Sequence, residues 1–169
     1  TVLFDRDGTL VVDVPYNGDT ERVRLQPGAR EAVARLRRAG FALGVVTNQS
    51  GIARGYVSRE EVDAVNAHID QLLGGLDVWK VCPHQPDSGC ACRKPAPGLL
   101  LQAAAALAVS PSACAVIGDI GTDVAAGLAA GASPILVPTE VTRPEEIGKA
   151  PVVATDLLAA SAIVLAETR

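Results

Sequence analysis

Short β-branched apolar runs alternate with alanine-rich amphipathic runs along the whole chain, and this alternation limits the fold more than any other feature. The apolar runs, which we expect to be strands, are Val2–Phe4, Leu43–Val46, Val78–Val81, Ala115–Ile117 and Ile135–Val137. The amphipathic runs, which we expect to be helices, are Gly28–Ala39, Glu60–Leu73, Gly98–Ala108, Asp123–Ala130 and Asp156–Ala166. Strands that are separated by helices pair in parallel, so the pattern predicts an α/β fold, a three-layer Rossmann-like parallel sheet with helices on both faces.

The residues between these runs indicate where individual helices start and stop. Pro27 suits the first turn of a helix and Gly40 its left-handed end. Ser58, with Glu61 three residues later, predicts a capping box for the second helix. The segment Thr139–Ala150 is rich in Pro, Thr and Glu, and we expect it to be a loop with a short helix.

Size, charge and composition exclude several classes of protein. No linker divides the 169 residues and no insertion is long enough for a lid, so we expect a single domain over residues 1–169 without a separate cap domain. A net charge of -4 and 3% aromatic residues argue against binding to nucleic acid. The apolar stretches are too short and too interrupted for a membrane span, and we expect a cytoplasmic monomer. The chain starts with Thr1 and contains no Met, so we expect a few leading residues to be missing.

Two carboxylates follow the first apolar run, in the segment DRDGT. Asp5 and Asp7 are two residues apart, and side chains with this spacing in extended backbone point to the same side. One carboxylate can attack phosphorus, and the other can protonate a leaving oxygen and later deprotonate water. Taken alone, the motif is also compatible with a surface turn whose carboxylates cap nearby backbone groups.

Two further polar segments follow later strands. The segment TNQSG places Thr47, Asn48 and the backbone N–H groups after them where they can hold phosphate oxygens, although Thr-Asn is also an ordinary helix-capping pair. The segment GDIGTD adds Asp119 and Asp123 at the same predicted edge of the sheet. Four carboxylates in one place need a counter-ion, and Mg²⁺ with oxygen ligands is the first choice. For Asp123, capping of the following helix and support of the metal remain equally open.

Three of the four cysteines lie with a histidine in the segment CPHQPDSGCACRKP. Cys82, His84, Cys90 and Cys92 supply the complete ligand set of a tetrahedral structural zinc site. A disulfide or chance clustering is the alternative, and a reducing compartment disfavours the disulfide. The loop leads into Arg93 and Lys94, and it would hold them in place so that Lys94 can place positive charge beside a phosphoryl group.

In this order, the four segments resemble the motifs of the haloacid-dehalogenase (HAD) superfamily of phosphatases. DRDGT resembles the first motif, TN the second, RKP the lysine motif and GDIGTD the acidic motif, over essentially the whole chain. The cysteine loop and VVTNQSGIARG resemble the lidless subgroup of D-glycero-D-manno-heptose 1,7-bisphosphate phosphatases and histidinol-phosphate phosphatases. The resemblance implies a Mg²⁺-dependent hydrolase of a small phosphorylated metabolite, with a sugar bisphosphate favoured, that acts through an aspartyl phosphate.

The resemblance also implies a role for each matching residue. The catalytic residues would be Asp5 as nucleophile, Asp7 as acid/base, Thr47 and Lys94. Mg²⁺ would be held by Asp5, by Asp7 through its backbone carbonyl and by Asp119, with Asp123 in support, and Zn²⁺ by Cys82, His84, Cys90 and Cys92. The residues that would bind substrate are Asp13, Val14, Pro15, Tyr16, Asn48, Gln49, Ser50 and Arg93.

Two positions depart from the pattern of the heptose enzymes, and several rival functions stay open. Val11 stands where those enzymes often have Asn, and Ile120 stands where a polar or basic residue is common. The short zinc loop also fits the histidinol-phosphate branch, and another sugar phosphate or a nucleotide is a further candidate substrate. A catalytically inactive zinc-stabilised binding module would keep the fold, but it would not need all of the catalytic groups. A phosphatase of nucleic-acid 3′ ends would need a basic stripe that this sequence lacks.

Overall fold

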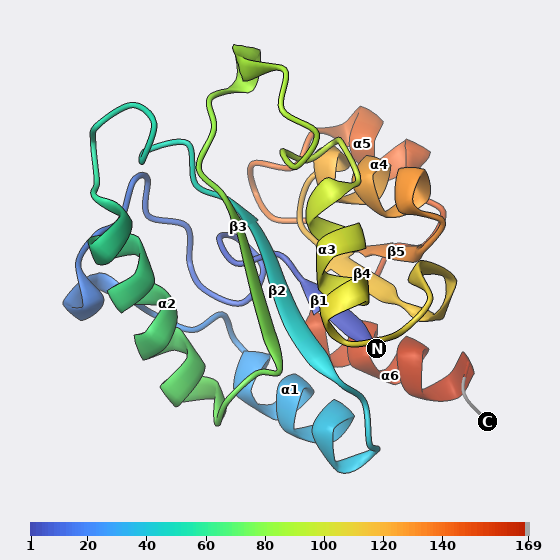
Figure 1. The fold of residues 1–169 in the computed structure, drawn as a ribbon. Coiled ribbons are helices and arrows are strands. Elements are labelled where there is room, and N and C mark those ends of the chain that lie inside the picture. The colour runs from blue at the N-terminus through green and yellow to red at the C-terminus, as the bar shows by residue number, and fades with distance from the viewer. Residues whose placement is uncertain (168–169) are drawn as a thin grey trace.

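The computed structural model describes residues 1–167, which form a five-stranded parallel sheet between two layers of helices (Figure 1). The strands are β1 (Val2–Phe4), β2 (Leu43–Asn48), β3 (Val78–Cys82), β4 (Ala115–Gly118) and β5 (Ser133–Leu136). The helices are α1 (Ala29–Arg38), α2 (Arg59–Leu73), α3 (Gly98–Ala106), α4 (Gly121–Ala130), α5 (Pro144–Lys149) and α6 (Leu157–Glu167). The strand order is β3-β2-β1-β4-β5, so β1 lies at the centre. The predicted α/β architecture is confirmed.

The alternation of side chains along the central strand divides the core into two parts. Val2 and Phe4 point into the core that α1, α2 and α6 cover, whereas Leu3 points into the core that α3 and α4 cover. All three side chains are fully buried. A strand that is buried on both faces explains why its sequence is a continuous apolar run.

The ends of several elements differ from the prediction. Strand β2 continues to Asn48, because Thr47 and Asn48 pair with Val81 and Cys82 of β3. Helix α1 starts at Ala29, so Pro27 precedes the helix and does not form its first turn as expected. Pro27 is followed by Gly28, which caps the helix in a left-handed conformation, with φ of 79°, that breaks helical geometry at that point.

Other helix boundaries agree with the prediction. Gly40 is left-handed just after α1, with φ of 85°. Ser58 Oγ accepts a hydrogen bond from the Glu61 N–H, and the Glu61 carboxylate accepts one from the Ser58 N–H, which is the capping box expected for α2. Helix α5 lies inside the predicted loop Thr139–Ala150.

Because all strands are parallel, their carboxyl ends lie at one edge of the sheet. The loops that follow β2 and β3 rise side by side above this edge (Figure 1). They are tied by a hydrogen bond from the Ala53 N–H to the Pro83 carbonyl. In the described part of the chain, no helix combines the length and apolar character needed to cross a membrane.

Candidate active site

A cavity of about 350 Å³ opens at the carboxyl edge of the sheet. It is lined by every residue for which a catalytic or substrate-binding role was predicted: Asp5, Asp7, Asp13, Val14, Pro15, Tyr16, Thr47, Asn48, Gln49, Ser50, Arg93 and Lys94. Asp119, predicted to bind Mg²⁺, and Asp123, predicted to support it, line the cavity too. Segments that are far apart in the sequence therefore meet at one place.

Three buried carboxylates form the floor of this cavity. Oxygens of Asp5, Asp119 and Asp123 all lie within 4.8 Å of one another. Asp5 follows β1, Asp119 follows β4, and Asp123 lies in the first turn of α4. Mg²⁺ prefers oxygen ligands such as carboxylates, so the donor type of this group fits the ion.

Two glycines let these carboxylates come together. A Cβ atom on Gly8 would lie 2.2 Å from Asp119 Oδ2, and one on Gly118 would lie 2.3 Å from the Asp123 Cβ. Gly8 also has φ of 81°, which side chains rarely adopt. Both positions therefore require glycine if Asp119 and Asp123 are to keep their places in the acidic cluster.

Lys94 is the cation of the cluster, and its side chain is almost fully buried. Its Nζ lies 2.6 Å from Asp123 Oδ1 and 2.8 Å from Asp5 Oδ1, and it donates to the Val46 carbonyl at 2.8 Å. The three N–H groups of the ammonium thus have three acceptors. Burial disfavours the charged form, but the carboxylates of Asp123 and Asp5 outweigh it and raise the pKa of Lys94 above its ordinary value.

One ammonium cannot balance three carboxylates, and the pKa values reflect this. Burial raises the pKa of Asp5 to about 8, in spite of the attraction of Lys94. Burial and then repulsion from Asp123 raise the pKa of Asp119 to about 7. When all three carboxylates are ionised, two negative charges remain uncompensated, which is the charge that a divalent cation would neutralise.

Of the two roles left open for Asp123, capping of the following helix is present in the structure, and support of a metal stays a prediction. Its Oδ2 accepts a hydrogen bond from the Ile120 N–H at 3.2 Å, which caps the start of α4. Its Oδ1 accepts from Lys94 and belongs to the acidic group. The two carboxylate oxygens of Asp123 thus contact different groups.

The polar residues at the end of β2 are held by local hydrogen bonds. Gln49 Nε2 donates to Thr47 Oγ1 at 2.8 Å and to Asp7 Oδ2 at 2.7 Å. Asn48 lines the cavity, but its side-chain amide pairs with the backbone of Lys94, since Oδ1 accepts from the Lys94 N–H and Nδ2 donates to the Lys94 carbonyl, each at 3.1 Å. This pairing fixes the Lys94 backbone against β2, a contact that the predicted substrate-binding role of Asn48 did not include.

Asp7 lies apart from the acidic group. Its carboxylate forms an ion pair with Arg6, whose Nη2 is 2.9 Å from Asp7 Oδ2. Arg6 also lines the cavity and is 1% exposed, although no role was predicted for it. The available signal was an arginine between two aspartates just after a fully apolar strand, where a buried charge needs a partner.

Two threonines were also missed, and both hold Asp119. Thr9 Oγ1 donates to Asp119 Oδ1 at 3.1 Å. Thr142 Oγ1 donates to the Asp119 carbonyl at 2.6 Å from the loop after β5. Single threonines in loops carry no periodic signal, so only the fold reveals these contacts.

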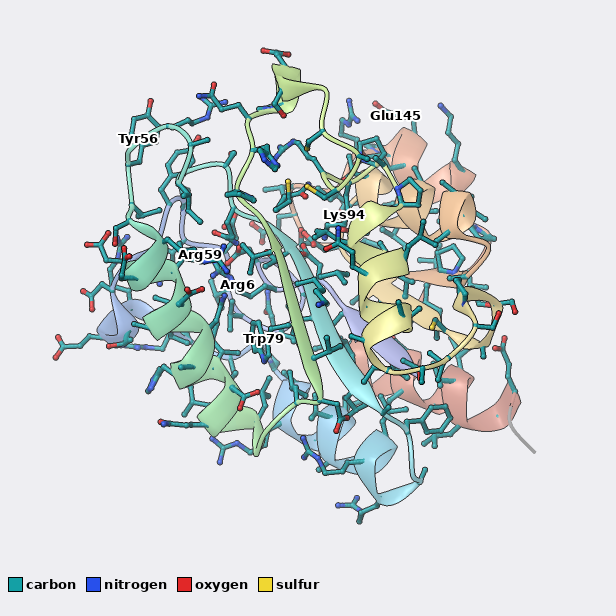
Figure 2. All side chains as sticks on the ribbon, viewed as in Figure 1. Arg6, Tyr56, Arg59, Trp79, Lys94 and Glu145 are labelled. Carbon is teal, nitrogen blue, oxygen red and sulfur yellow. The ribbon has the colours of Figure 1, made fainter. Side chains whose placement is uncertain are left out.

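One aromatic side chain, Tyr16, lines the cavity. Tyr16 and Tyr56 contact each other edge to face, with ring centroids 4.8 Å apart, and join the loop after Asp13 to the loop after β2. Figure 2 shows Tyr56 on the loop beyond the amino end of α2. Burial and then the charge of Asp7 raise the pKa of Asp13. Val141, which was not predicted, adds an exposed apolar side chain to the lining.

The cysteine loop forms a second compact group of ligand atoms. Cys82 Sγ lies 3.7 Å from Cys90 Sγ and 3.2 Å from Cys92 Sγ, and His84 Nδ1 lies 3.5 Å and 3.3 Å from the Cys82 and Cys92 sulfurs. Ligands about 2.3 Å from a tetrahedral Zn²⁺ stand about 3.8 Å apart, whereas disulfide sulfurs stand about 2.05 Å apart. All four cysteines, including the separate Cys114, are free thiols. The arrangement fits a metal and not a disulfide.

Known proteins resemble this chain in sequence. The family model for HAD-hydrolase-like proteins matches residues 91–162. D-glycero-beta-D-manno-heptose-1,7-bisphosphate 7-phosphatase of Pseudomonas putida is 39% identical over 147 residues, which cover 82% of this chain and 82% of the relative. The enzyme of the same name from Escherichia coli is 37% identical over 140 residues, which cover 76% of this chain and 73% of the relative.

A solved structure extends the similarity to the fold. The crystal structure of D,D-heptose 1,7-bisphosphate phosphatase from B. bronchiseptica, complexed with magnesium and phosphate, superposes with a TM-score of 0.87 at 32% identity. The match covers 98% of each chain. On this similarity and that of the curated relatives, the chain is a phosphatase that belongs to the HAD-like hydrolases and, within them, to the family of the D-glycero-beta-D-manno-heptose-1,7-bisphosphate 7-phosphatases.

Proposed function

We propose that this phosphatase removes the 7-phosphate of D-glycero-D-manno-heptose 1,7-bisphosphate through an aspartyl phosphate on Asp5. The observation that carries the proposal is the meeting of Asp5, Asp119, Asp123 and Lys94 within hydrogen-bonding and ligand distances at one cavity. The sugar bisphosphate is favoured because the relatives at 36–39% identity carry that substrate in their names.

In the first step, Asp5 attacks phosphorus in line with the bond to the leaving alcohol. Lys94 holds Asp5 Oδ1 and would offset the negative charge of the transferring phosphoryl group. Asp7 then gives a proton to the leaving oxygen, and later it takes a proton from the water that hydrolyses the aspartyl phosphate. Thr47 and the backbone that follows it would hold the phosphoryl oxygens.

Asp5, the Asp7 backbone carbonyl and Asp119 would hold Mg²⁺, with Asp123 in support. The ion would supply Lewis-acid charge that brings the anionic nucleophile and the anionic substrate together. The two uncompensated negative charges of the buried cluster support this assignment.

The rest of the substrate would lie at the mouth of the cavity. Asp13–Tyr16, Gln49 and Ser50 would face its hydroxyl groups, and Arg93 would face a second phosphate. Arg93 Nη1 donates to the His84 carbonyl, so the cysteine loop orients this cation. We further propose that the chain works as one domain, as a monomer in the cytoplasm, and binds neither nucleic acid nor membrane.

Cys82, His84, Cys90 and Cys92 would hold a structural Zn²⁺ with no open coordination position. Their mutual distances support this proposal. Through Arg93 and Lys94, the metal would stabilise the side of the cavity that binds phosphate.

Parallel turnover assays test the substrate. Heptose 1,7-bisphosphate and histidinol phosphate are compared at equal enzyme concentration, and we expect a higher kcat/KM for the heptose. Preferred turnover of histidinol phosphate would reject the substrate while leaving the phosphatase chemistry in place.

Asp5→Asn tests the chemistry. We expect turnover to fall below detection while folding and zinc content stay unchanged, because an amide is not a nucleophile toward phosphorus. Asp63→Asn is the matched control, since Asp63 lies on the exposed side of α2 and pairs with Arg59. Substantial activity in Asp5→Asn would reject the aspartyl phosphate.

A further inference from the structure

Arg6 is the largest fully buried residue in the described part of the chain, although its side chain carries a charge. It lies between Asp5 and Asp7 in the sequence, and Figure 2 shows it in the layer between α2 and the sheet. An unpaired guanidinium would be costly in this environment. Its partners therefore indicate why the chain keeps a charge at this position.

The guanidinium of Arg6 joins Asp7 to a distant helix. Nε lies 3.1 Å from both Asp7 carboxylate oxygens, and Nη2 lies 2.9 Å from Oδ2. On its other side, Nη1 donates to Asn66 Oδ1 at 2.8 Å. Asn66 belongs to α2, is 6% exposed and lies sixty residues further along the chain. The planar fork of arginine fixes the direction of both contacts at once.

The two oxygens of Asp7 are held unequally in the part of the chain that the structure describes. Oδ2 accepts from Arg6 Nε, from Arg6 Nη2 and from Gln49 Nε2, the last at 2.7 Å. Oδ1 accepts from Arg6 Nε alone, at 3.1 Å. The carboxylate cannot rotate without breaking the contacts of Oδ2, so Oδ1 is the oxygen left to exchange a proton.

We propose that Arg6 is a positioning residue that fixes the acid/base Asp7, and that Asn66 locks Arg6 from α2. This inference rests on the proposed aspartyl-phosphate function. In the first step, a bond forms between the Asp5 oxygen and phosphorus while the bond from phosphorus to the leaving oxygen breaks. The electron pair of the broken bond stays on the leaving oxygen, which takes the proton from Asp7 Oδ1.

A comparison of leaving groups tests the inference. The phenolate of p-nitrophenyl phosphate departs without a proton, whereas the sugar alcohol of heptose 1,7-bisphosphate requires one. We expect Asn66→Ala, which removes the lock on Arg6, to lower kcat/KM for the heptose about tenfold and for p-nitrophenyl phosphate less than about twofold. Arg6→Lys, which keeps the charge but loses the fork, should give the same selective loss and a larger one.

Ser58→Ala is the matched control. Ser58 caps the same helix, so its loss weakens α2 without removing a contact of Arg6. This variant should leave the ratio of the two kcat/KM values at the wild-type level. An unchanged ratio in Asn66→Ala, or an equal change of the ratio in Ser58→Ala, would overturn the positioning role.

A different result would reject the proposed function itself. Substantial turnover by Asp5→Asn would remove the aspartyl phosphate, whatever the leaving-group ratios are. Asp7→Asn gives the upper limit of the effect, since it should lower kcat/KM for the heptose, relative to p-nitrophenyl phosphate, more than any other variant. Should Arg6→Lys fail to fold, Asn66→Ala decides, because it retains the Arg6–Asp7 pair.

Discussion

Gly8 shows how closely single residues are fitted at this site. It packs closely against Asp119, because a Cβ atom added to it would lie only 2.2 Å from Asp119 Oδ2. Its φ is 81°. An alanine here would meet two penalties, a left-handed backbone and a direct clash with a buried carboxylate. The clash cannot be relieved cheaply, because Asp119 is fixed by Thr9 and Thr142.

We therefore expect Gly8→Ala to lower the free energy of unfolding by roughly 3 kcal/mol and kcat by at least about 100-fold, since the displaced Asp119 no longer aligns with Asp5. Urea denaturation and steady-state kinetics measure the two effects. Gly40→Ala is the control, because Gly40 has φ of 85°, no neighbour within 4 Å of an added Cβ and a location outside the cavity lining. It should cost about 1–2 kcal/mol and leave kcat unchanged. Equal activity in both variants would contradict the close fit.

At the scale of elements, periodicity and capping chemistry predicted the sheet well. The five apolar runs became the strands, and Ser58 and Gly40 marked helix ends correctly because their signals are local. Thr47 and Asn48 were placed beyond the strand because polar residues end an apolar run. The structure extends β2 through them, because β3 supplies backbone partners that a sequence pattern does not contain.

The same distinction applies to the candidate site. Residues in recognisable motifs were found: those with predicted catalytic, substrate-binding or Mg²⁺-binding roles line the cavity, and the four predicted zinc ligands form their own group. Arg6, Thr9 and Thr142 were missed because their importance lies in partners that are distant in the sequence. The two contacts of Asp123, with the Ile120 N–H and with Lys94, could be found only from the fold.

The cysteine loop is the element whose metal state we expect to control the cavity. It contacts the neighbouring loop through the Ala53 N–H and the Pro83 carbonyl, and it leads directly into Lys94. Removal of Zn²⁺ by a chelator, with Mg²⁺ resupplied, should lower the Tm by on the order of 10 °C and reduce kcat. Calorimetry and activity assays measure these effects.

Cysteine variants separate metal binding from general destabilisation. Cys90→Ser should lose bound zinc, as measured by elemental analysis, because it removes one ligand of four. Cys114→Ser changes a buried cysteine outside the group and should retain one zinc per chain. Full zinc content in Cys90→Ser would contradict the assignment of the loop.

At the scale of the whole molecule, the acidic cluster couples stability to pH. The pKa values of Asp5 and Asp119, about 8 and about 7, lie above the ordinary aspartate value of 3.8. Between pH 4 and pH 8, roughly, the folded chain therefore binds more protons at these groups than the unfolded chain. The free energy of unfolding consequently falls as pH rises through this interval in the absence of a metal. Mg²⁺ competes with those protons, so its stabilising effect should grow over the same interval.

Thermal unfolding with and without Mg²⁺, at about pH 5.5 and about pH 8.5, tests this coupling. We expect the increase in Tm caused by Mg²⁺ to be larger at the higher pH, where the ion no longer has to displace protons from Asp5 and Asp119. Asp119→Asn is the informative variant, because it removes one titrating carboxyl and one proposed Mg²⁺ ligand together. It should flatten the pH dependence of the metal-free Tm and reduce the response to Mg²⁺. An increase in Tm that is the same at both pH values would mean that the ion binds away from the cluster, and the two surplus charges would then need another partner.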